Sequence, residues 1–478
     1  MRSWRRGRTA QICWVSFALL GGVLVSRLAF DYFQAFLLAI AVAGFVLLRF
    51  RLGLAVTLVF GFGLWRGAVT DFPNTPVGRQ MGRTVALSGI VADDPGRTAN
   101  NQIGFKLSDV ILNGAATGQD VQIYTPYKDM QRGYRVVASG KLKSRRGLVA
   151  SQVSFARVVV VSDQVSLLDR LRQRFFTGVR GAMPEPVSGF GLGLLIGVRS
   201  LIDKDLQDVL TAVGLSHLIA VSGYNLTIIV HAIRRFSGML SHFSVTALSL
   251  WLIGGFLIVT GFSAPIVRAA LVSALGLLIV YYGYIVRPLV IIAVPAALTV
   301  AWKPDYLVRD VSWQLSFLAF VGVLVLAPLM EERWVRRPNA IKSLMIESTA
   351  AQILTAPLIL GLFTNLSLVS PVSNVVILPL VPLAMLLSFI TGLAAMASPL
   401  VGVWVALPGM GLLGMMIGLS QWFATWPYAN INFQTSTNQV LLLYGLVAVF
   451  TASLYRWRAH HPEDVVAREY SPYDTKLG

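Results

Sequence analysis

Polar side chains that could do chemistry stand at fixed intervals in one apolar stretch of the chain: His217, Ser222 and Asn225. Spacings of five and eight residues put them on one broad side of a regular helix. His217 and Ser222 could form the pair of an intramembrane serine hydrolase, but the sequence lacks a G-x-S-x-G turn at Ser222 and an acidic residue nearby to orient the imidazole. The other interpretations are a polar path through a membrane and plain hydrogen bonds between helices.

Charged groups recur further along the chain. Arg268 follows Pro265 by three residues near the outer end of an apolar segment, where it could meet a phosphate or extend to the membrane surface. Asp310 begins another apolar segment, with Arg309 before it and Gln314 one turn after it. Ionisable groups inside hydrocarbon cost ~2.5–3.5 kcal/mol, so these side chains should face protein or water. Asp310 could pair with Arg268, along a polar path or only to hold two helices together.

Two neutral amides complete the set of path candidates. Gln352 and Asn374 stand within apolar segments and could line a path for a charged polymer without trapping it. Trp302 and Trp313 are expected to anchor helices at the membrane surface.

The residues that metal and nucleotide chemistry require are scarce. The chain has one cysteine, Cys13, five histidines and no phosphate-binding glycine loop. His460 and His461 lack the H-x-H-x-D-H spacing of a dinuclear site. We therefore predict no catalytic residue, no metal and no cofactor.

The elements that position these residues must be membrane helices. Of the 478 residues 55% are hydrophobic and 13% are charged, whereas a soluble domain needs about 25% charged residues. The predicted fold class is a polytopic α-helical membrane protein. A span needs ~20 apolar residues. Twelve spans are expected, at about 10–30, 32–48, 52–70, 214–233, 243–262, 264–284, 288–302, 311–329, 344–364, 371–397, 400–424 and 437–456.

The net charge of +18 is distributed unevenly and predicts an orientation. Basic residues cluster at 2–8, 49–51, 234–235, 333–342 and 456–458, and the positive-inside rule assigns such loops to the cytoplasm. We therefore expect a multi-pass protein of the inner membrane. Both termini are expected on its cytoplasmic side.

An insert at residues 77–165 has a different pattern. Short alternating segments at about 84–92, 103–110, 119–124, 134–140 and 153–161 predict five strands of a small, extracytoplasmic β-barrel that resembles an oligonucleotide-binding fold. Twelve Lys and Arg residues outnumber six Asp in this insert, which suits a polyanion.

Aromatic residues of the insert could stack on bases, or they could simply fill the barrel core; Phe105 and Tyr134 are open to both interpretations. The candidate nucleic-acid contacts are Lys106, Tyr124, Tyr127, Lys128, Arg135, Lys141, Lys143, Arg145 and Arg146.

Several segments together resemble the ComEC family, competence proteins that form an inner-membrane DNA-uptake channel. They are GLGLLIGVRSLIDKD at 191–205, TAVGLSHLIAVSGYNLT at 211–227, GFSAPIVRAA at 261–270, PDYLVRDVSWQLSFLA at 304–319, AAQILTAPL at 350–358 and SNVVILPLVP at 373–382. The barrel insert after the opening spans is also similar to the family.

The chain departs from that pattern in two places. Asn225 stands where family members usually have a histidine, two residues after the Ser-Gly pair. Many members also carry a C-terminal metallo-β-lactamase-like domain thought to be a nuclease. We do not expect such a domain in this chain, because only about 20 residues follow the last predicted span.

The resemblance implies a channel subunit for single-stranded DNA, not an enzyme, working in the lipid bilayer. It also implies separate partners: an extracytoplasmic DNA receptor, a strand-degrading nuclease and a cytoplasmic ATPase. A secondary or lipid-type transporter and the serine hydrolase remain alternatives. The expected domains are three N-terminal helices at 1–76, the barrel at 77–165, interfacial linker helices at 166–212, the channel at 213–458 and a cytoplasmic tail at 459–478.

Overall fold

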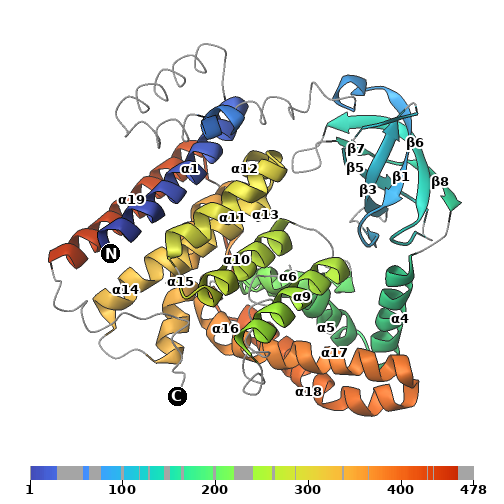
Figure 1. Ribbon diagram of the computed structural model, residues 1–478. Coiled ribbons are helices and arrows are strands. Elements are labelled where there is room, and N and C mark those ends of the chain that lie inside the picture. The colour runs from blue at the N-terminus through green and yellow to red at the C-terminus, as the bar shows by residue number, and fades with distance from the viewer. Residues whose placement is uncertain are drawn as a thin grey trace.

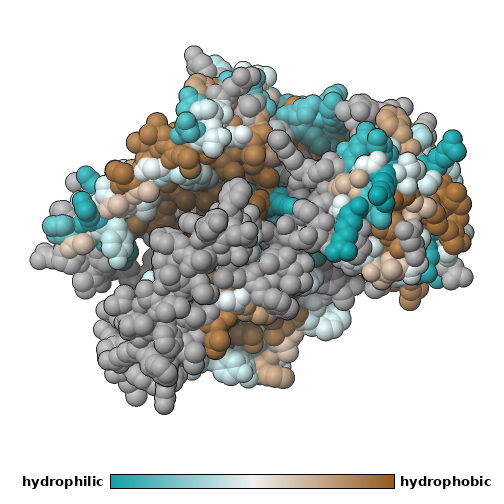
Figure 2. Space-filling view, turned by 90° about the horizontal axis from the view of Figure 1, so that it is seen from above, coloured by the Kyte–Doolittle hydropathy of each residue, from teal (hydrophilic) through white to brown (hydrophobic). Residues whose placement is uncertain are grey.

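A computed structural model describes residues 2–28, 58–63, 77–97, 102–162, 166–197, 201–219, 241–260, 264–335, 339–427 and 429–460, with gaps at 113, 118, 128–129, 145–150, 286, 364 and 434. A β-barrel lies beside a body of helices, and α4 connects the two (Figure 1). Brown, hydrophobic surface covers parts of the helical body, whereas much of the teal, hydrophilic surface belongs to the barrel (Figure 2).

Five strands close the barrel in the order β1-β3-β5-β7-β6, with β6 pairing back to β1. Numbered along the chain, these five run first, second, third, fifth, fourth, with the third and fifth parallel, as in an oligonucleotide-binding fold. The short strands β2 and β4 pair with β3, and β8 extends the sheet beside β6. The bounds are β1 Thr84–Val91, β2 Gly96–Arg97, β3 Ile103–Leu112, β4 Ala115–Ala116, β5 Val121–Thr125, β6 Arg135–Ser144, β7 Ser151–Val153 and β8 Arg157–Ser162.

Alternating side chains build the barrel core. On β5, and on β3 from Ile103 to Leu107, every second residue is buried, including Phe105 and Ile123. Leu87 of β1 and Leu142 of β6 close the same core. The predicted five-stranded closed barrel is confirmed, because a period of two puts one face of each strand inside.

The predicted strand at 153–161 is in fact two strands. The chain breaks between β7 and β8, where Phe155 has a positive φ of 54°. Because of that turn, β7 closes the barrel and β8 adds to its outer edge.

Helices make up the rest of the described chain. They are α1 Arg2–Leu28, the 3-10 turn η2 Gly78–Gln80, α4 Leu167–Ala182, α5 Val187–Ile196, α6 Lys204–Ala212, α7 Ser216–Ile219, α9 His242–Thr260, α10 Ala264–Tyr281, α11 Pro288–Trp302, α12 Asp305–Arg309, α13 Val311–Val321, the π-helical η4 Gly322–Leu326, α14 Ala327–Trp334, α15 Ala340–Phe363, α16 Ser370–Ile377, η5 Leu378–Leu380, α17 Val381–Ala397, α18 Pro399–Ala424 and α19 Thr437–His460. A two-stranded pairing joins β9 Asn365–Leu366 to β10 Ile431–Asn432.

Six helical segments of the described chain are long and apolar enough to cross a membrane. Shorter apolar helices include α5, α11 and parts of α9 and α10. The expected span at 32–48 lies outside the described residues, as do most of those at 52–70 and 214–233. A multi-pass helical protein is therefore confirmed, but the count of twelve is not. The six segments are Thr9–Ser26, Val311–Trp334, Ala340–Phe363, Ser370–Ala397, Pro399–Ala424 and Thr437–His460.

Small residues let the helices beside the barrel pack closely. A Cβ on Gly402 of α18 would lie 2.6 Å from the Ala395 side chain of α17. Helix α5 is almost entirely buried in the same cluster, where Phe190 and Leu194 are fully enclosed. This segment belongs to the predicted interfacial linker at 166–212, and in the structure it lies inside the helical body.

Helices α1 and α11 run parallel. Near their starts Cys13 and Leu289 line the same slot, and further on Val23 packs with Ala296 in one cluster. Lys303, just after α11, contacts the barrel. The barrel therefore sits at the C-terminal end of α11, and Cys13 of α1 lies at its N-terminal end, about 22 Å away along α11.

Candidate nucleic-acid interface

A polar row crosses the outer face of the barrel. Lys106 of β3 pairs with Gln122 of β5, Gln122 with Gln152 of β7, and Gln152 with Lys143 of β6. Residues paired across neighbouring strands share one face of a sheet. The row therefore has a lysine at each end and two glutamine amides between them. It crosses the outer surface of four neighbouring strands, β3, β5, β7 and β6.

Strand β6 presents more positive charge outward. Arg135, Lys141 and Lys143 are exposed, whereas Val136 and Leu142 between them are buried. Two-residue spacing along a strand separates neighbouring lysines by about 6.8 Å. These basic residues therefore lie on the outside of the barrel, and their contact with nucleic acid stays a prediction.

The aromatic candidates divide by strand face. Tyr124 points outward on β5 and Tyr127 is 44% exposed, so both are accessible. Phe105 is fully buried and Tyr134 packs against the barrel core. For Phe105 the stacking interpretation is wrong, because its position on β3 is inward. Lys128, Arg145 and Arg146 lie outside the described residues.

One barrel carboxylate joins the two parts of the molecule. The Oδ2 atom of Asp120 lies 3.6 Å from Lys106 Nζ and 3.4 Å from Nζ of Lys303, which precedes α12. Burial, together with the negative charges of Asp310 and Asp120, raises the pKa of the nearby Tyr306 phenol to about 12. The face with Lys106 is therefore turned toward α12.

Arg268 lies one turn into α10, in the interior of the body. The residue is 6% exposed, and its guanidinium carbon lies 5.5 Å from the centre of the Phe317 ring. Its Nη1 atom is buried without a hydrogen-bond partner among the described residues. A buried guanidinium with an unused donor is costly, and it is the kind of group that a phosphate satisfies well.

Asp310 is the carboxylate that attracts Arg268. Its Oδ1 atom accepts hydrogen bonds from the backbone amides of Ser312 at 2.9 Å and Trp313 at 3.2 Å, which caps α13. Asp310 thus caps α13, and the Nη1 donor of Arg268 has no hydrogen-bond acceptor among the described residues.

The other two candidates on this side brace α12. Gln314 donates from Nε2 to the carbonyls of Leu307 at 2.9 Å and Val308 at 3.2 Å. Arg309 lies 3.7 Å from Asp305 within the same short helix. Gln314 thus holds α12 against α13, and the Arg309 pair braces α12 itself.

A second polar cluster joins α15 and α16. The Nδ2 atom of Asn374 donates to Ser348 Oγ at 2.6 Å, and Gln352 donates to the Ser367 carbonyl. The amide oxygens of Asn374 and Gln352 are buried without a partner in the described chain. Each of these two amides thus joins α15 to a segment that follows it and keeps an acceptor atom to spare.

The segment before His217 packs on this cluster. Ser373 donates to the Val213 carbonyl at 2.8 Å. Gly214 has a φ of +75°, and a side chain there would collide with Ser370. His217 is exposed, with Nδ1 at 3.0 Å from the Gly214 carbonyl. Ser222 and Asn225 lie outside the described residues, so their relation to His217 stays a prediction.

Sequence reasoning did not single out Asp120, Lys303 or Arg172. Arg172 of α4 binds Asp94 of the barrel with both prongs of its guanidinium. Burial lowers the pKa of Arg172, and the charge of Asp94 opposes that shift. Such contacts between distant segments leave no local pattern, because any surface carboxylate has the same sequence signature.

Trp313 differs from its predicted role. It is 6% exposed and donates from Nε1 to Thr299 Oγ1 at 3.0 Å. It is a core residue between α13 and α11 and not a surface anchor, whereas Trp302 is exposed.

Comparison with known proteins identifies the family. No curated protein and no solved structure matches the chain. The family model described as "Competence protein" matches residues 194–458, more than half of the 478 residues. This range runs from α5 to α19 and contains both buried polar clusters. The chain therefore belongs to the competence protein family, and its role is in the uptake of DNA.

Proposed function

We propose that the protein is a channel subunit that passes single-stranded DNA through the inner membrane during natural transformation. The observation that carries this proposal is Arg268, a buried arginine with a free donor in the interior of a membrane body. Ionisable groups in that position mark substrate paths. Family membership supplies the cargo class, which is DNA.

The orientation of the barrel supports an entry route. Lys106, at one end of the polar row, contacts Asp120, and Asp120 contacts Lys303 next to α12. A strand that follows the outer face of the barrel would reach α12 first. Asp310 follows α12 directly, and Arg268 interacts with Asp310. The positive groups thus form a discontinuous line from the barrel toward the interior.

The cluster of Gln352 and Asn374 supports a polar continuation. Neutral amides can exchange hydrogen bonds with phosphates or bases without holding them as tightly as a charge would. Their spare oxygens are acceptors, which suit the amino groups of unpaired bases. This arrangement distinguishes a polymer path from a site built to retain one anion.

The helix directions support the proposed orientation. The basic start of α1 lies at the end of α11 that is remote from the barrel. Arg458 pairs with Glu332 at 3.3 Å, and Arg333 stacks on Trp457, so two more basic segments meet. With basic ends in the cytoplasm, both termini are cytoplasmic and the barrel is extracytoplasmic. The proposed domains keep the bounds predicted from the sequence.

Electrostatic attraction brings DNA to the barrel but does not move it against a gradient. We therefore propose that a separate cytoplasmic ATPase draws the strand inward. A separate extracytoplasmic receptor delivers DNA and a separate nuclease removes the second strand.

The test is DNA uptake by cells that carry Arg268→Gln. Uptake of labelled transforming DNA should fall at least about tenfold, because ~1.4 kcal/mol of lost phosphate interaction corresponds to that factor. Arg456→Gln, an exposed arginine of α19, is the matched control and should leave uptake intact. Membrane fractions must contain equal amounts of each variant. Unchanged uptake by Arg268→Gln would remove this role.

A further inference from the structure

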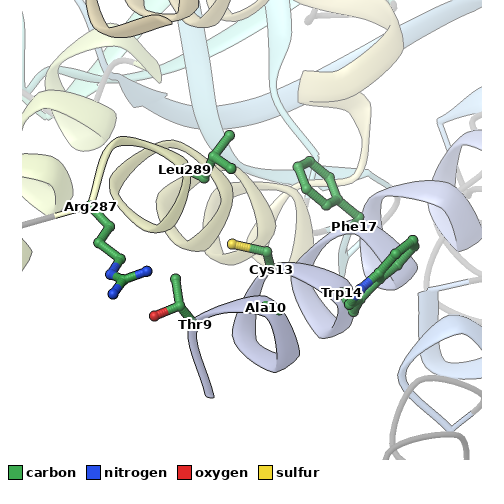
Figure 3. Close-up of a pocket in the computed structure, with 7 residues that line it drawn as sticks. All are labelled: Thr9, Ala10, Cys13, Trp14, Phe17, Arg287 and Leu289. Atoms are coloured by element: carbon green, nitrogen blue, oxygen red, sulfur yellow. The ribbon is translucent and has the colours of Figure 1, made fainter. Parts of the chain in front are cut away.

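A slot between α1 and α11 is a site that the DNA path does not use. Its volume is about 370 Å³, within the range of ligand pockets. Cys13, Phe17 and Leu289 form an apolar wall (Figure 3). Arg287 and Thr9 lie at the same end of the slot, where Figure 3 shows the guanidinium near the threonine. The slot thus combines an apolar groove with a positively charged side chain at one end.

Arg287 has charge to offer. It precedes the first residue of α11 and makes no capping hydrogen bond with its side chain. It takes part in none of the ion pairs found in the described chain. A half-buried guanidinium without a carboxylate is matched by an anionic ligand such as a phosphate diester.

The surroundings of the slot have the composition of a membrane surface. Trp14 is 56% exposed, and the turn between α10 and α11 exposes Tyr282, Tyr284 and Ile285 by 68%, 62% and 77%. Tryptophan and tyrosine gather at the level of lipid headgroups. The aromatic residues therefore set the mouth of the slot at headgroup depth, with the apolar wall extending toward the acyl chains.

The sign of the local charge selects the kind of lipid. The sequence that precedes Thr9 of the slot is basic, with Arg2, Arg5, Arg6 and Arg8. Basic pockets between membrane helices bind anionic headgroups. A zwitterionic headgroup would bring a positive choline or ethanolamine into the same basic neighbourhood.

We propose that this slot holds an anionic phospholipid. One acyl chain lies along Cys13, Phe17 and Leu289, and the phosphate meets the Arg287 guanidinium. The lipid fills the space between α1 and α11 and stabilises their parallel packing at the end remote from the barrel. This site is independent of the path through Arg268.

Cys13 makes the test direct, because it is the only cysteine of the chain and lines the slot. The intact protein is placed in nanodiscs of phosphatidylcholine alone or with phosphatidylglycerol, and modification by the uncharged reagent N-ethylmaleimide is followed by mass spectrometry. Phosphatidylglycerol should slow modification about fivefold, which corresponds to one basic residue acting on an anionic headgroup.

Variants separate the site from general effects of membrane charge. Arg287→Gln should abolish the difference between the two lipid compositions, and Arg287→Lys should keep it. Arg456→Gln should show the same phosphatidylglycerol effect as the wild-type protein. The lower surface pH of an anionic membrane acts equally on these two proteins. Each rate is compared with the same variant in phosphatidylcholine, so an altered thiol reactivity cancels.

Two results would overturn the proposal. One is a phosphatidylglycerol effect of equal size in Arg287→Gln and in the wild-type protein. The other is protection by inorganic phosphate in phosphatidylcholine nanodiscs as strong as that by phosphatidylglycerol, since a free anion would then suffice and the apolar wall would have no part.

Discussion

Arg172 of α4 and Asp94 of the barrel, 78 residues apart in the chain, form an ion pair in which both guanidinium nitrogens donate. Helix α4 in turn packs on α17 and α18. Gln173 and Gln131 add a hydrogen bond of 2.8 Å beside this pair. The barrel is thus fastened to the helical body at α4 as well as at Lys303, and two attachment points resist rotation better than one.

Replacing Arg172 should loosen the barrel. Arg172→Ala leaves Asp94 half-buried without its partner, so the free energy of unfolding should fall by about 1.5–3 kcal/mol, the contribution of a charged hydrogen-bonding group. Heat denaturation of the intact protein in nanodiscs measures the loss. Arg174→Ala, at an exposed position two residues away, should change stability by less than about 0.5 kcal/mol. Equal effects of both variants would contradict a specific attachment.

Replacing Gly214 by alanine should destabilise the protein for two reasons. Its φ of +75° costs an alanine about 1–2 kcal/mol, and the added Cβ would also collide with Ser370. Gly283→Ala is the control, since its φ is +70° but no atom lies within 4 Å of the added Cβ. Gly214→Ala should therefore lower the melting temperature more than Gly283→Ala does. An equal loss would mean that backbone strain alone matters there.

The barrel lysines should determine the salt dependence of DNA binding. Each phosphate contact on a single strand contributes ~0.7 to the slope of log K against log salt. Lys141→Ala with Lys143→Ala should therefore reduce that slope by about 1.4, as measured by fluorescence anisotropy of an oligonucleotide with the intact protein. Lys204→Ala, on α6, removes a charge away from the barrel. If Lys204→Ala reduced the slope by about 0.7, the same amount per lysine as the barrel variant, DNA binding would depend only on the total charge of the protein.

Asn374 tests the polar cluster apart from Arg268. Asn374→Ala removes the spare amide oxygen and should lower uptake of labelled DNA by about tenfold, equivalent to ~1.4 kcal/mol. Ser388→Ala is matched in burial, but its hydroxyl bonds only to Ala384 in its own helix. It should leave uptake unchanged. Full uptake by Asn374→Ala at normal membrane levels would restrict this cluster to a packing role.

Local patterns predicted the barrel well because a strand reports its own inside and outside. In the structure Lys106 and Lys143 lie on the outer face and Leu107 and Leu142 on the inner one, as the alternation of side chains along a strand requires. Phe105 was ambiguous because an aromatic residue suits both faces, and only its register on β3 decides. The break at Phe155 was missed because a turn within a valine-rich run carries no strong signal.

Helix contacts were less predictable. Trp313 and Trp302 have the same residue type in similar apolar surroundings, yet one lies in the core and the other at the surface. Trp313 packs in a cluster with residues of α1, α11 and α12 and donates its indole N–H to Thr299 of α11. Which helix lies opposite a given face is set by packing of the whole bundle.

The sequence by itself determined a multi-pass membrane protein of the competence type with a basic five-stranded barrel, since hydropathy, strand alternation and motif order are properties of single segments. Only the tertiary structure decided that Asn374 binds Ser348, that Arg268 keeps a free donor, and that Asp120 turns the barrel toward α12. Those relations depend on contacts between segments far apart in the chain, and no local pattern encodes them.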